Sequence, residues 1–261
     1  MGVVNVTPDS FSDGGSFADA DTAVAHGARL ADDGAAIVDI GGESTRPGAE
    51  PVSIDAELRR VVPVVERLRA ARPDVAISVD TRHATVAEAA VAAGAIIVND
   101  ISGGADAALV ELCAEASAGV VLMHMQGEPR SMQEDPRYDD VVADVHEYLR
   151  ERVEAAVFAG VTAAQVCVDP GIGFGKTLEH NLELLRSLAT FRDLDAGLVI
   201  GVSRKRFIGT LTDTEDPTDR VEGSLAAAVL AVASGADVVR AHDVRATVRA
   251  LRVADAIARR P

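Results

Sequence analysis

One recurring pattern constrains the fold of this chain more than any other feature: a helical stretch ends near a glycine, a short apolar run follows, and the run stops at a polar residue. It occurs at 32–40, 92–100, 117–124 and 233–243. The runs are continuous and rich in β-branched residues instead of alternating, as in strands that are covered on both faces. The pattern therefore predicts parallel strands. The glycines that precede the runs suit the left-handed backbone conformation that ends a helix; they are Gly34, Gly94, Gly119 and Gly235.

Four further apolar runs, at 2–6, 75–80, 165–170 and 197–203, bring the candidate strands to eight. Amphipathic stretches lie between them. Eight alternating units in 261 residues, with no break in composition, favour a closed TIM (β/α)8 barrel over an open doubly wound sheet. We expect one catalytic domain over residues 1–261. Because Pro63 lies inside the second helical stretch, we expect that helix to be kinked or to begin later.

Composition narrows the partners that this chain can have. A formal charge of −16 argues against a broad nucleic-acid surface and against binding to anionic membranes. No apolar run approaches the roughly 20 residues of a membrane span. Cys113 and Cys167 form no C-x-x-C motif, which fits a reducing cytoplasm. We therefore expect a cytoplasmic enzyme that acts on small molecules.

Polar side chains stand where the predicted strands end. A single one of them can equally well cap a helix or pair with a neighbour. Their presence at all eight strand ends favours an active site, because barrel enzymes draw their catalytic residues from several strands at the carboxyl ends. The sequence therefore predicts a site at this rim for a small substrate that bears phosphate. The groups are Asn5, Asp39, Asp80, Asn99, Asp100, His124, Asp169, Ser203, Arg204, Lys205, Arg240, His242 and Asp243.

Two connections are too unusual to be plain turns. The segment 5–17 mixes turn residues with Phe11 and Phe17, which predicts a mobile lid that carries aromatic contacts. The segment 41–51 presents Arg46, whose planar fork suits a carboxylate or phosphate group. Both segments are expected to take part in substrate binding.

A third connection, DPGIGFGKT at 169–177, has the look of a nucleotide-binding loop but fails both tests for one. A P-loop needs Gly at the position of Pro170, and the dinucleotide fingerprint needs Gly or Ala at the position of Lys176. The loop therefore does not predict nucleotide binding.

These segments together resemble the dihydropteroate synthase family of folate biosynthesis, nearly from end to end. The resemblance implies condensation of 6-hydroxymethyl-7,8-dihydropterin diphosphate with 4-aminobenzoate, with Mg²⁺ as cofactor and a homodimer as the usual assembly. The motifs occur in the family's order and spacing: MGVVNVTPDSFSDGG, DIGGESTRPGA, SVDT, IIVNDISGG, LMHMQGEP with SMQ, DPGIGFGKT, GVSRKRFIG and VRAHDV.

The resemblance implies a pterin pocket made by Asp80, Asn99 and Asp169, with Lys205 donating from the rim. This agrees with the chemistry, since adjacent N–H groups of an aminopyrimidinone match the two oxygens of a carboxylate. Phe174 is expected beside 4-aminobenzoate, as is Arg206, which stands where many members have Ser.

The remaining roles concern the diphosphate and the mobile loops. Arg240, His242 and Asn5 match the positions that hold diphosphate and magnesium, with Asn5 as the metal ligand. Two loops are expected to close over the reacting groups, through Phe11, Asp13, Thr45 and Arg46. We expect a dissociative displacement in which Asp13, Asp80, Lys205, Arg240 and His242 are catalytic.

The chain departs from the family pattern at two further points. His83 stands where Lys or Arg is more common, with Arg82 adjacent, and is expected to begin a helix. The chain also begins inside what is strand one of longer members, so a short N-terminal segment is expected to be missing. Two alternative functions stay open: a pterin-dependent methyltransferase module, and a catalytically idle paralogue that binds pterin.

Overall fold

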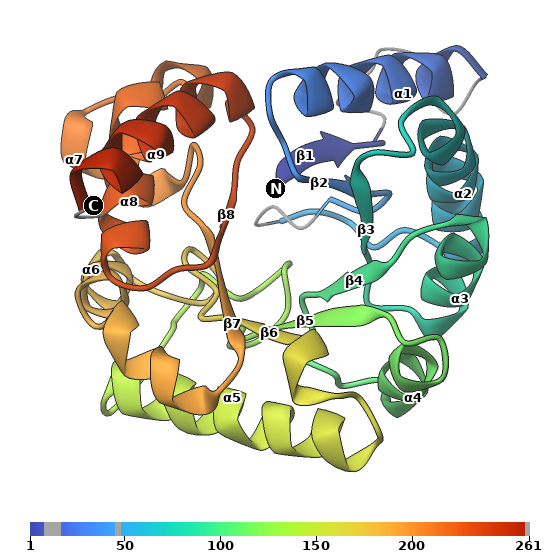
Figure 1. The fold of residues 1–261 in the computed structure, drawn as a ribbon. Helices are drawn as coiled ribbons and strands as arrows, with labels where there is room; N and C mark the ends of the chain where they lie inside the picture. The colour runs from blue at the N-terminus through green and yellow to red at the C-terminus, as the bar shows by residue number, and fades with distance from the viewer. Residues whose placement is uncertain (8–16, 45–47, 259–261) are drawn as a thin grey trace.

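The computed structural model describes residues 1–7, 17–44 and 48–258, and it contains eight parallel strands in sequence order (Figure 1). A parallel bridge between Gly2 and Ala241 joins the first strand to the last. The amide of Ala241 donates to the Met1 carbonyl at 2.9 Å. The predicted (β/α)8 barrel is confirmed. The strands are β1 (Gly2–Asn5), β2 (Ile37–Gly41), β3 (Ala76–Asp80), β4 (Ile97–Asp100), β5 (Gly119–Met123), β6 (Val166–Asp169), β7 (Gly197–Gly201) and β8 (Val238–Arg240).

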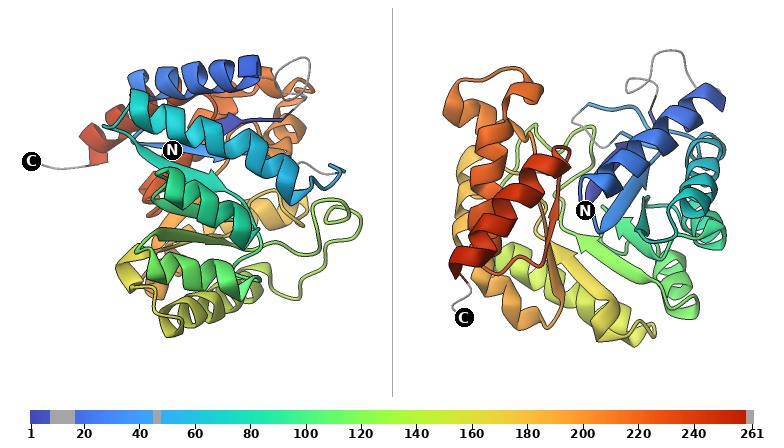
Figure 2. Two further views of the ribbon diagram at one scale, coloured as in Figure 1. Left: turned by 90° about the vertical axis from the view of Figure 1, so that its right-hand side faces the viewer. Right: turned by 45° about the horizontal axis from the view of Figure 1, so that its top comes forward.

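The helices form a ring around the strands (Figures 1 and 2). No helix in the described part of the chain is long and apolar enough to cross a bilayer. The long connection between β5 and α5 projects from the barrel in the left view of Figure 2. The helices are α1 (Phe17–Asp32), α2 (Ile54–Ala71), α3 (Ala84–Ala93), α4 (Ala107–Glu115), α5 (Val141–Phe158), α6 (Leu178–Arg186), α7 (Arg206–Thr212), α8 (Val221–Ala233) and α9 (Val244–Ala258).

Burial explains why the strand sequences are apolar without alternating. Consecutive residues of one strand point to opposite faces of the sheet, and in a barrel one face meets the interior and the other meets the helices. Ile40 and the neighbouring Asp39 in β2 are both completely buried, and every strand contributes at least one apolar residue to one core. The polar residues at the carboxyl ends of several strands face a cavity instead.

Three of the four glycines predicted to end helices do so in the left-handed region. Gly34, Gly94 and Gly235 have φ values of +102°, +117° and +107°. The prediction for Gly119 is wrong, because Gly119 is already the first residue of β5 and Ser117 takes the left-handed conformation instead, with φ +53°. Helix α4 ends at Glu115, so the reversal is complete before Gly119 is reached.

Pro63 lies inside α2, which runs without interruption from Ile54 to Ala71. The alternative that this helix begins later is therefore wrong. Ser53 caps the helix by accepting a hydrogen bond at Oγ from the amide of Ala56, at 3.3 Å. The cap fixes the start of the helix more than two turns before the proline.

Candidate active site

A cavity opens at the carboxyl ends of the strands, and most of the side chains predicted for the pterin and diphosphate line it. They come from five different strand ends and the loops that follow. The cavity is lined by Val3, Asp80, Asn99, Ile101, Met123, Asp169, Ile172, Phe174, Gly201, Ser203, Lys205, Arg240 and His242. Among the predicted site residues, the fold thus brings together Asp80 and His242, which are 162 positions apart.

Arg240 ties two buried carboxylates together at the base of this cavity. Its Nε donates to Asp39 Oδ2 at 2.7 Å, and its Nη2 donates to Asp80 Oδ2 at 2.7 Å. Asn99 Nδ2 donates to the same oxygen of Asp39, at 3.0 Å. The amide of Asn99 is thereby oriented, so its own oxygen is left to accept a hydrogen bond from a ligand.

Asp39 was predicted as one of the polar groups at the strand ends, but the sequence assigned it no substrate or catalytic role. It is completely buried, and its Oδ1 has no hydrogen-bond partner. The available signal was a charged residue inside the apolar strand β2, two positions before Gly41-Gly42. What the sequence did not indicate is that its partner Arg240 lies 201 positions further along the chain.

The charged groups in the cavity shift one another's pKa values. Burial raises the pKa of Asp80 to about 7, against the lowering effect of the Arg240 charge, and Asp39 and Glu57 raise it further. Burial tends to lower the pKa of Arg240, but the charges of Asp39 and Asp80 raise it above its ordinary value. Arg240 is therefore a permanent cation, while Asp80 titrates near neutral pH.

Asp169 is held by the loop that follows β6. The amide of Gly171 donates to Asp169 Oδ1 at 2.7 Å, which leaves Oδ2 for another donor. Burial raises the pKa of Asp169, and Lys205, Lys176 and Arg240 oppose this. Gly171 has φ +71°, and a Cβ there would collide with the His124 carbonyl oxygen, so this close approach requires glycine.

The same loop carries Phe174 to the side of Lys205. The Lys205 ammonium lies 4.1 Å from the centroid of the Phe174 ring, a cation–π contact. Burial lowers the pKa of Lys205 to about 8, and the nearby charge of Asp169 limits that fall. Lys205 thus offers a cation at the rim next to an aromatic face.

Lys176 holds the loop after β6 in place and is almost completely buried. Its ammonium donates to the Phe174 carbonyl at 3.0 Å and lies 2.9 Å from His124 Nδ1. Burial lowers the pKa of Lys176 to about 7 and that of His124 to about 3. His124 is therefore neutral and accepts from Lys176, which fixes the backbone that presents Phe174.

His242 is oriented by Ser203. The Ser203 hydroxyl accepts from the His242 amide at 3.1 Å and lies 3.1 Å from Nδ1 of the ring. Burial lowers the pKa of His242 to about 4, helped by the charges of Arg240 and Arg204. When the hydroxyl donates to Nδ1, the neutral ring carries its proton on Nε2.

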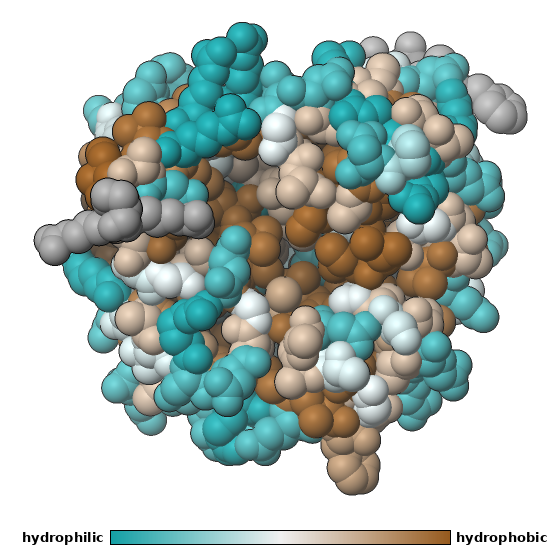
Figure 3. Space-filling view, in the orientation of Figure 1, coloured by the Kyte–Doolittle hydropathy of each residue, from teal (hydrophilic) through white to brown (hydrophobic). Residues whose placement is uncertain are grey.

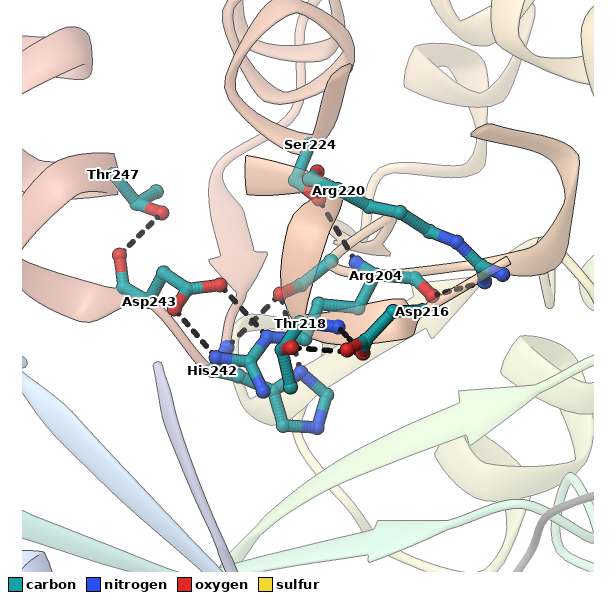
Figure 4. Close-up of polar contacts among 9 residues, drawn as sticks. Arg204, Asp216, Thr218, Arg220, Ser224, His242, Asp243 and Thr247 are labelled. Carbon is teal, nitrogen blue, oxygen red and sulfur yellow. Dashed lines mark hydrogen bonds and ion pairs between the residues drawn. The ribbon is translucent and has the colours of Figure 1, made fainter. Parts of the chain in front are cut away.

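Arg204 holds the connection between β7 and α7 in place (Figure 4). Its side chain donates to both carboxylate oxygens of Asp243, at 2.9 and 2.6 Å, and its amide donates to Ser224 Oγ at 2.9 Å. Its φ of +60° is unusual for a residue with a side chain. These contacts fix the backbone between Ser203 and Lys205, which both line the cavity.

Two predicted site residues in the described part of the chain do not line this cavity. Asn5 ends β1 and is half-buried, and Arg206 is exposed as the first residue of α7. His83 precedes α3 as its N-cap, which agrees with the expected helix start, although its side chain makes no capping hydrogen bond. Four predicted loop residues lie outside the described part of the chain: Phe11, Asp13, Thr45 and Arg46.

Comparison with known proteins agrees with this geometry. The family model for pterin binding enzymes matches residues 1–242. The dihydropteroate synthase of Escherichia coli K12 is 48% identical over 256 residues, which are 98% of this chain and 90% of that protein. The chain belongs to the dihydropteroate synthases, within the family of pterin binding enzymes. They are transferases of folate synthesis.

Solved structures of family members match the fold closely. The Xanthomonas albilineans dihydropteroate synthase with 4-aminobenzoic acid is 50% identical with a TM-score of 0.93, over 100% of this chain and 93% of that one. The same enzyme in complex with 7,8-dihydropteroate is 47% identical with a TM-score of 0.89, over 100% of this chain and 94% of that one. These findings favour a synthase over a pterin-dependent methyltransferase.

Proposed function

We propose that this chain, as one catalytic unit over residues 1–261, condenses 6-hydroxymethyl-7,8-dihydropterin diphosphate with 4-aminobenzoate to give 7,8-dihydropteroate and diphosphate. The observation that carries the proposal is that Asp80, Asn99 and Asp169 line the same cavity as Lys205 and Arg240. Acceptors for a flat heterocycle thus lie next to cations for its anionic tail. The ligands of the two Xanthomonas albilineans structures are consistent with these substrates.

Asp169 and Asn99 give the pterin ring its hydrogen-bond partners in this proposal. Asp169 has Oδ2 available while Gly171 occupies Oδ1, and the Asn99 oxygen is available while its nitrogen is bound by Asp39. A carboxylate oxygen accepts an N–H of the aminopyrimidinone edge in a charge-assisted hydrogen bond. Lys205 donates to the ring from the rim, and Phe174 flanks the aminobenzoate.

Arg240 and His242 hold the diphosphate tail. A guanidinium has five N–H donors, and the contacts with Asp39 and Asp80 use only two of them. The remaining donors are free to bind phosphate oxygens without breaking the buried ion pairs. Neutral His242 adds a donor at Nε2, on the side of the ring away from Ser203.

We propose Mg²⁺ as the cofactor, held by Asn5 together with the diphosphate. The donor chemistry fits, since Mg²⁺ keeps several waters and takes few protein oxygens when the substrate supplies phosphate oxygens. The Asn5 amide offers one neutral oxygen at the end of β1. When bound, the ion neutralises charge on the leaving diphosphate.

The reaction is a dissociative displacement. The bond between the methylene carbon and the diphosphate oxygen breaks, and positive charge spreads from the methylene into the pterin near Asp80. The aniline nitrogen then bonds to that carbon and releases one proton. An aniline is neutral at pH 7, so no covalent nucleophile is needed. This agrees with Cys113 and Cys167, whose pKa values are raised by burial and which line no part of the cavity.

We also propose a homodimer in a reducing cytoplasm. Two free cysteines fit a reducing compartment. Helices α7, α8 and α9 lie side by side, and apolar surface is visible over them at the left of Figure 3. Their exposed apolar side chains are suited to burial against a second copy; they are Leu211, Leu230, Val253 and Ile257.

The proposed function is tested by measuring diphosphate release from the pterin diphosphate with and without 4-aminobenzoate. We expect one diphosphate per dihydropteroate, with release dependent on the amine and abolished by EDTA. Release without the amine, or pterin binding with no release, would contradict the proposal. The second outcome would identify an idle pterin-binding paralogue.

A further inference from the structure

Three side chains that can ligate a metal meet outside the proposed substrate cavity. Glu43 lies in the connection after β2, Glu57 lies in the first turn of α2, and His83 is the N-cap of α3. One ligand atom of each lies within 4.8 Å of the ligand atoms of the other two. None of the three lines the cavity described above. The cluster is therefore not part of the proposed substrate site.

Glu57 is the residue that makes this cluster unusual. It is completely buried, and neither of its carboxylate oxygens has a hydrogen-bond partner. The Thr81 side chain lies near enough to lower the pKa of Glu57, but it is not at a hydrogen-bonding distance and angle. Burying a carboxylate costs several kcal/mol unless a partner compensates it. The carboxylate lies close to Glu43 and His83. A group that compensates its charge would therefore lie between these three side chains.

Arg82 does not supply that partner. Its Nε and Nη2 donate to the two oxygens of Glu43 at 3.3 and 3.2 Å, and the amide of Val52 donates to Glu43 Oε1 at 3.2 Å. The guanidinium therefore compensates one carboxylate of the two, and one negative charge is left. Glu43 Oε2 accepts only from Arg82 Nε and keeps a second lone pair, so it can still bind a cation.

We propose that Glu43, Glu57 and His83 form a binding site for one divalent transition-metal cation, with Zn²⁺ as the best match. Two carboxylate oxygens and one imidazole nitrogen are the mixed donors that Zn²⁺ accepts, with water or a further group completing four ligands. Mg²⁺ prefers oxygen donors alone, so this site is chemically distinct from the one proposed at Asn5. The cation links the connection after β2 to the starts of α2 and α3.

The experiment uses the whole chain after treatment with a chelator, and it titrates ZnCl2 in a calorimeter. We expect one Zn²⁺ per chain and a higher melting temperature in its presence. Glu57→Gln and His83→Asn should each weaken binding at least 100-fold and remove the increase in melting temperature. His83 is only half-buried, so His83→Asn is expected to fold even if Glu57→Gln does not.

His146→Gln is the matched control, because His146 also lies beside a carboxylate, with its Nε2 2.7 Å from Asp193 Oδ1, but belongs to no cluster of three such ligands among the described residues. It should bind Zn²⁺ as the unchanged chain does. Anomalous X-ray scattering at the zinc edge should place the ion between the three side chains. Absence of stoichiometric binding, or equal binding by His83→Asn, would overturn the proposal. The readouts do not involve turnover, so they are independent of the proposed function.

Discussion

Single residues in the cavity act through their neighbours, and Asp39 is the clearest case. It touches both Arg240 and Asn99, and it fixes the cation that is proposed to bind diphosphate and the amide that is proposed to bind pterin. A completely buried carboxylate in this position couples the two halves of the substrate site. We therefore class Asp39 as a positioning residue.

Asp39→Asn should lower both activity and stability. The substitution leaves Arg240 with one carboxylate partner, and breaking a buried ion pair costs about 3 kcal/mol or more. We expect urea unfolding to show that loss, and kcat/KM for the pterin diphosphate to fall by about 100-fold or more. Asp32→Asn is the control: Asp32 pairs with Arg72 at the surface, where the loss should be at most about 1 kcal/mol. Equal effects of the two substitutions would contradict the assigned role.

Asp80 should set the pH dependence of the reaction. Its raised pKa of about 7 means that the carboxylate form is lost as the pH falls through 7. We expect kcat/KM for the pterin diphosphate to rise with pH through a midpoint near 7, and to fall again as Lys205, with a pKa of about 8, loses its proton. Asp80→Asn should abolish the rising limb and leave the falling limb. It should also cut turnover far more than pterin binding; equal losses in both would contradict its role in stabilising charge.

At the scale of elements, the loop between β6 and α6 depends on contacts that cross to β5. Lys176 reaches the carbonyl of Phe174 and the ring of His124, and Gly171 passes close to the His124 backbone. The loop is thus a rigid support for Phe174, in contrast to a nucleotide-binding loop, whose backbone must be open to phosphate.

Lys176→Met should therefore act on the second substrate. The methionine keeps the length of the buried chain but loses the hydrogen bond to the Phe174 carbonyl. We expect KM for 4-aminobenzoate to rise about tenfold while pterin affinity, measured by calorimetry, changes less than threefold. A selective loss of pterin affinity would show that the loop serves the other half of the site.

The helices and strands also show which features of the fold could be predicted from the sequence and which could not. All eight strands were predicted, because burial on both faces leaves a continuous apolar signal in each. Gly119 was misassigned, since the pattern does not indicate which residue after a helix takes the left-handed conformation. The pairing of Asp39 with Arg240 and the meeting of Glu43, Glu57 and His83 were not foreseen. Such contacts depend on the stagger of strands around the closed barrel, which local periodicity does not encode.

In the whole molecule, closure of the barrel and the proposed pairing of two copies involve different surfaces. Closure brings Arg240 from β8 against Asp39 and Asp80 from β2 and β3. Each copy therefore holds a complete cavity of its own among the described residues. A dimer through α7, α8 and α9 would bury apolar surface on the outside of the barrel.

Leu230→Glu should convert the proposed dimer to a monomer. Leu230 is 68% exposed on α8, and a carboxylate buried there against a second copy would be unpaired. We expect sedimentation velocity to report half the mass. Phe158→Glu is the control: Phe158 is 95% exposed at the end of α5, far from α8 in Figure 1, and its substitution should leave the mass unchanged. A monomer before any substitution would remove the dimer proposal.

The central claim is that one rim of the barrel grips a pterin by its aminopyrimidinone edge while cations beside it hold the diphosphate. A crystal structure of the chain with the pterin diphosphate tests this directly. It should place the ring against Asp169 and Asn99, with the phosphates at Arg240 and His242. A ring bound elsewhere, for example in the groove between α4 and α5 beside Arg152, would contradict the account.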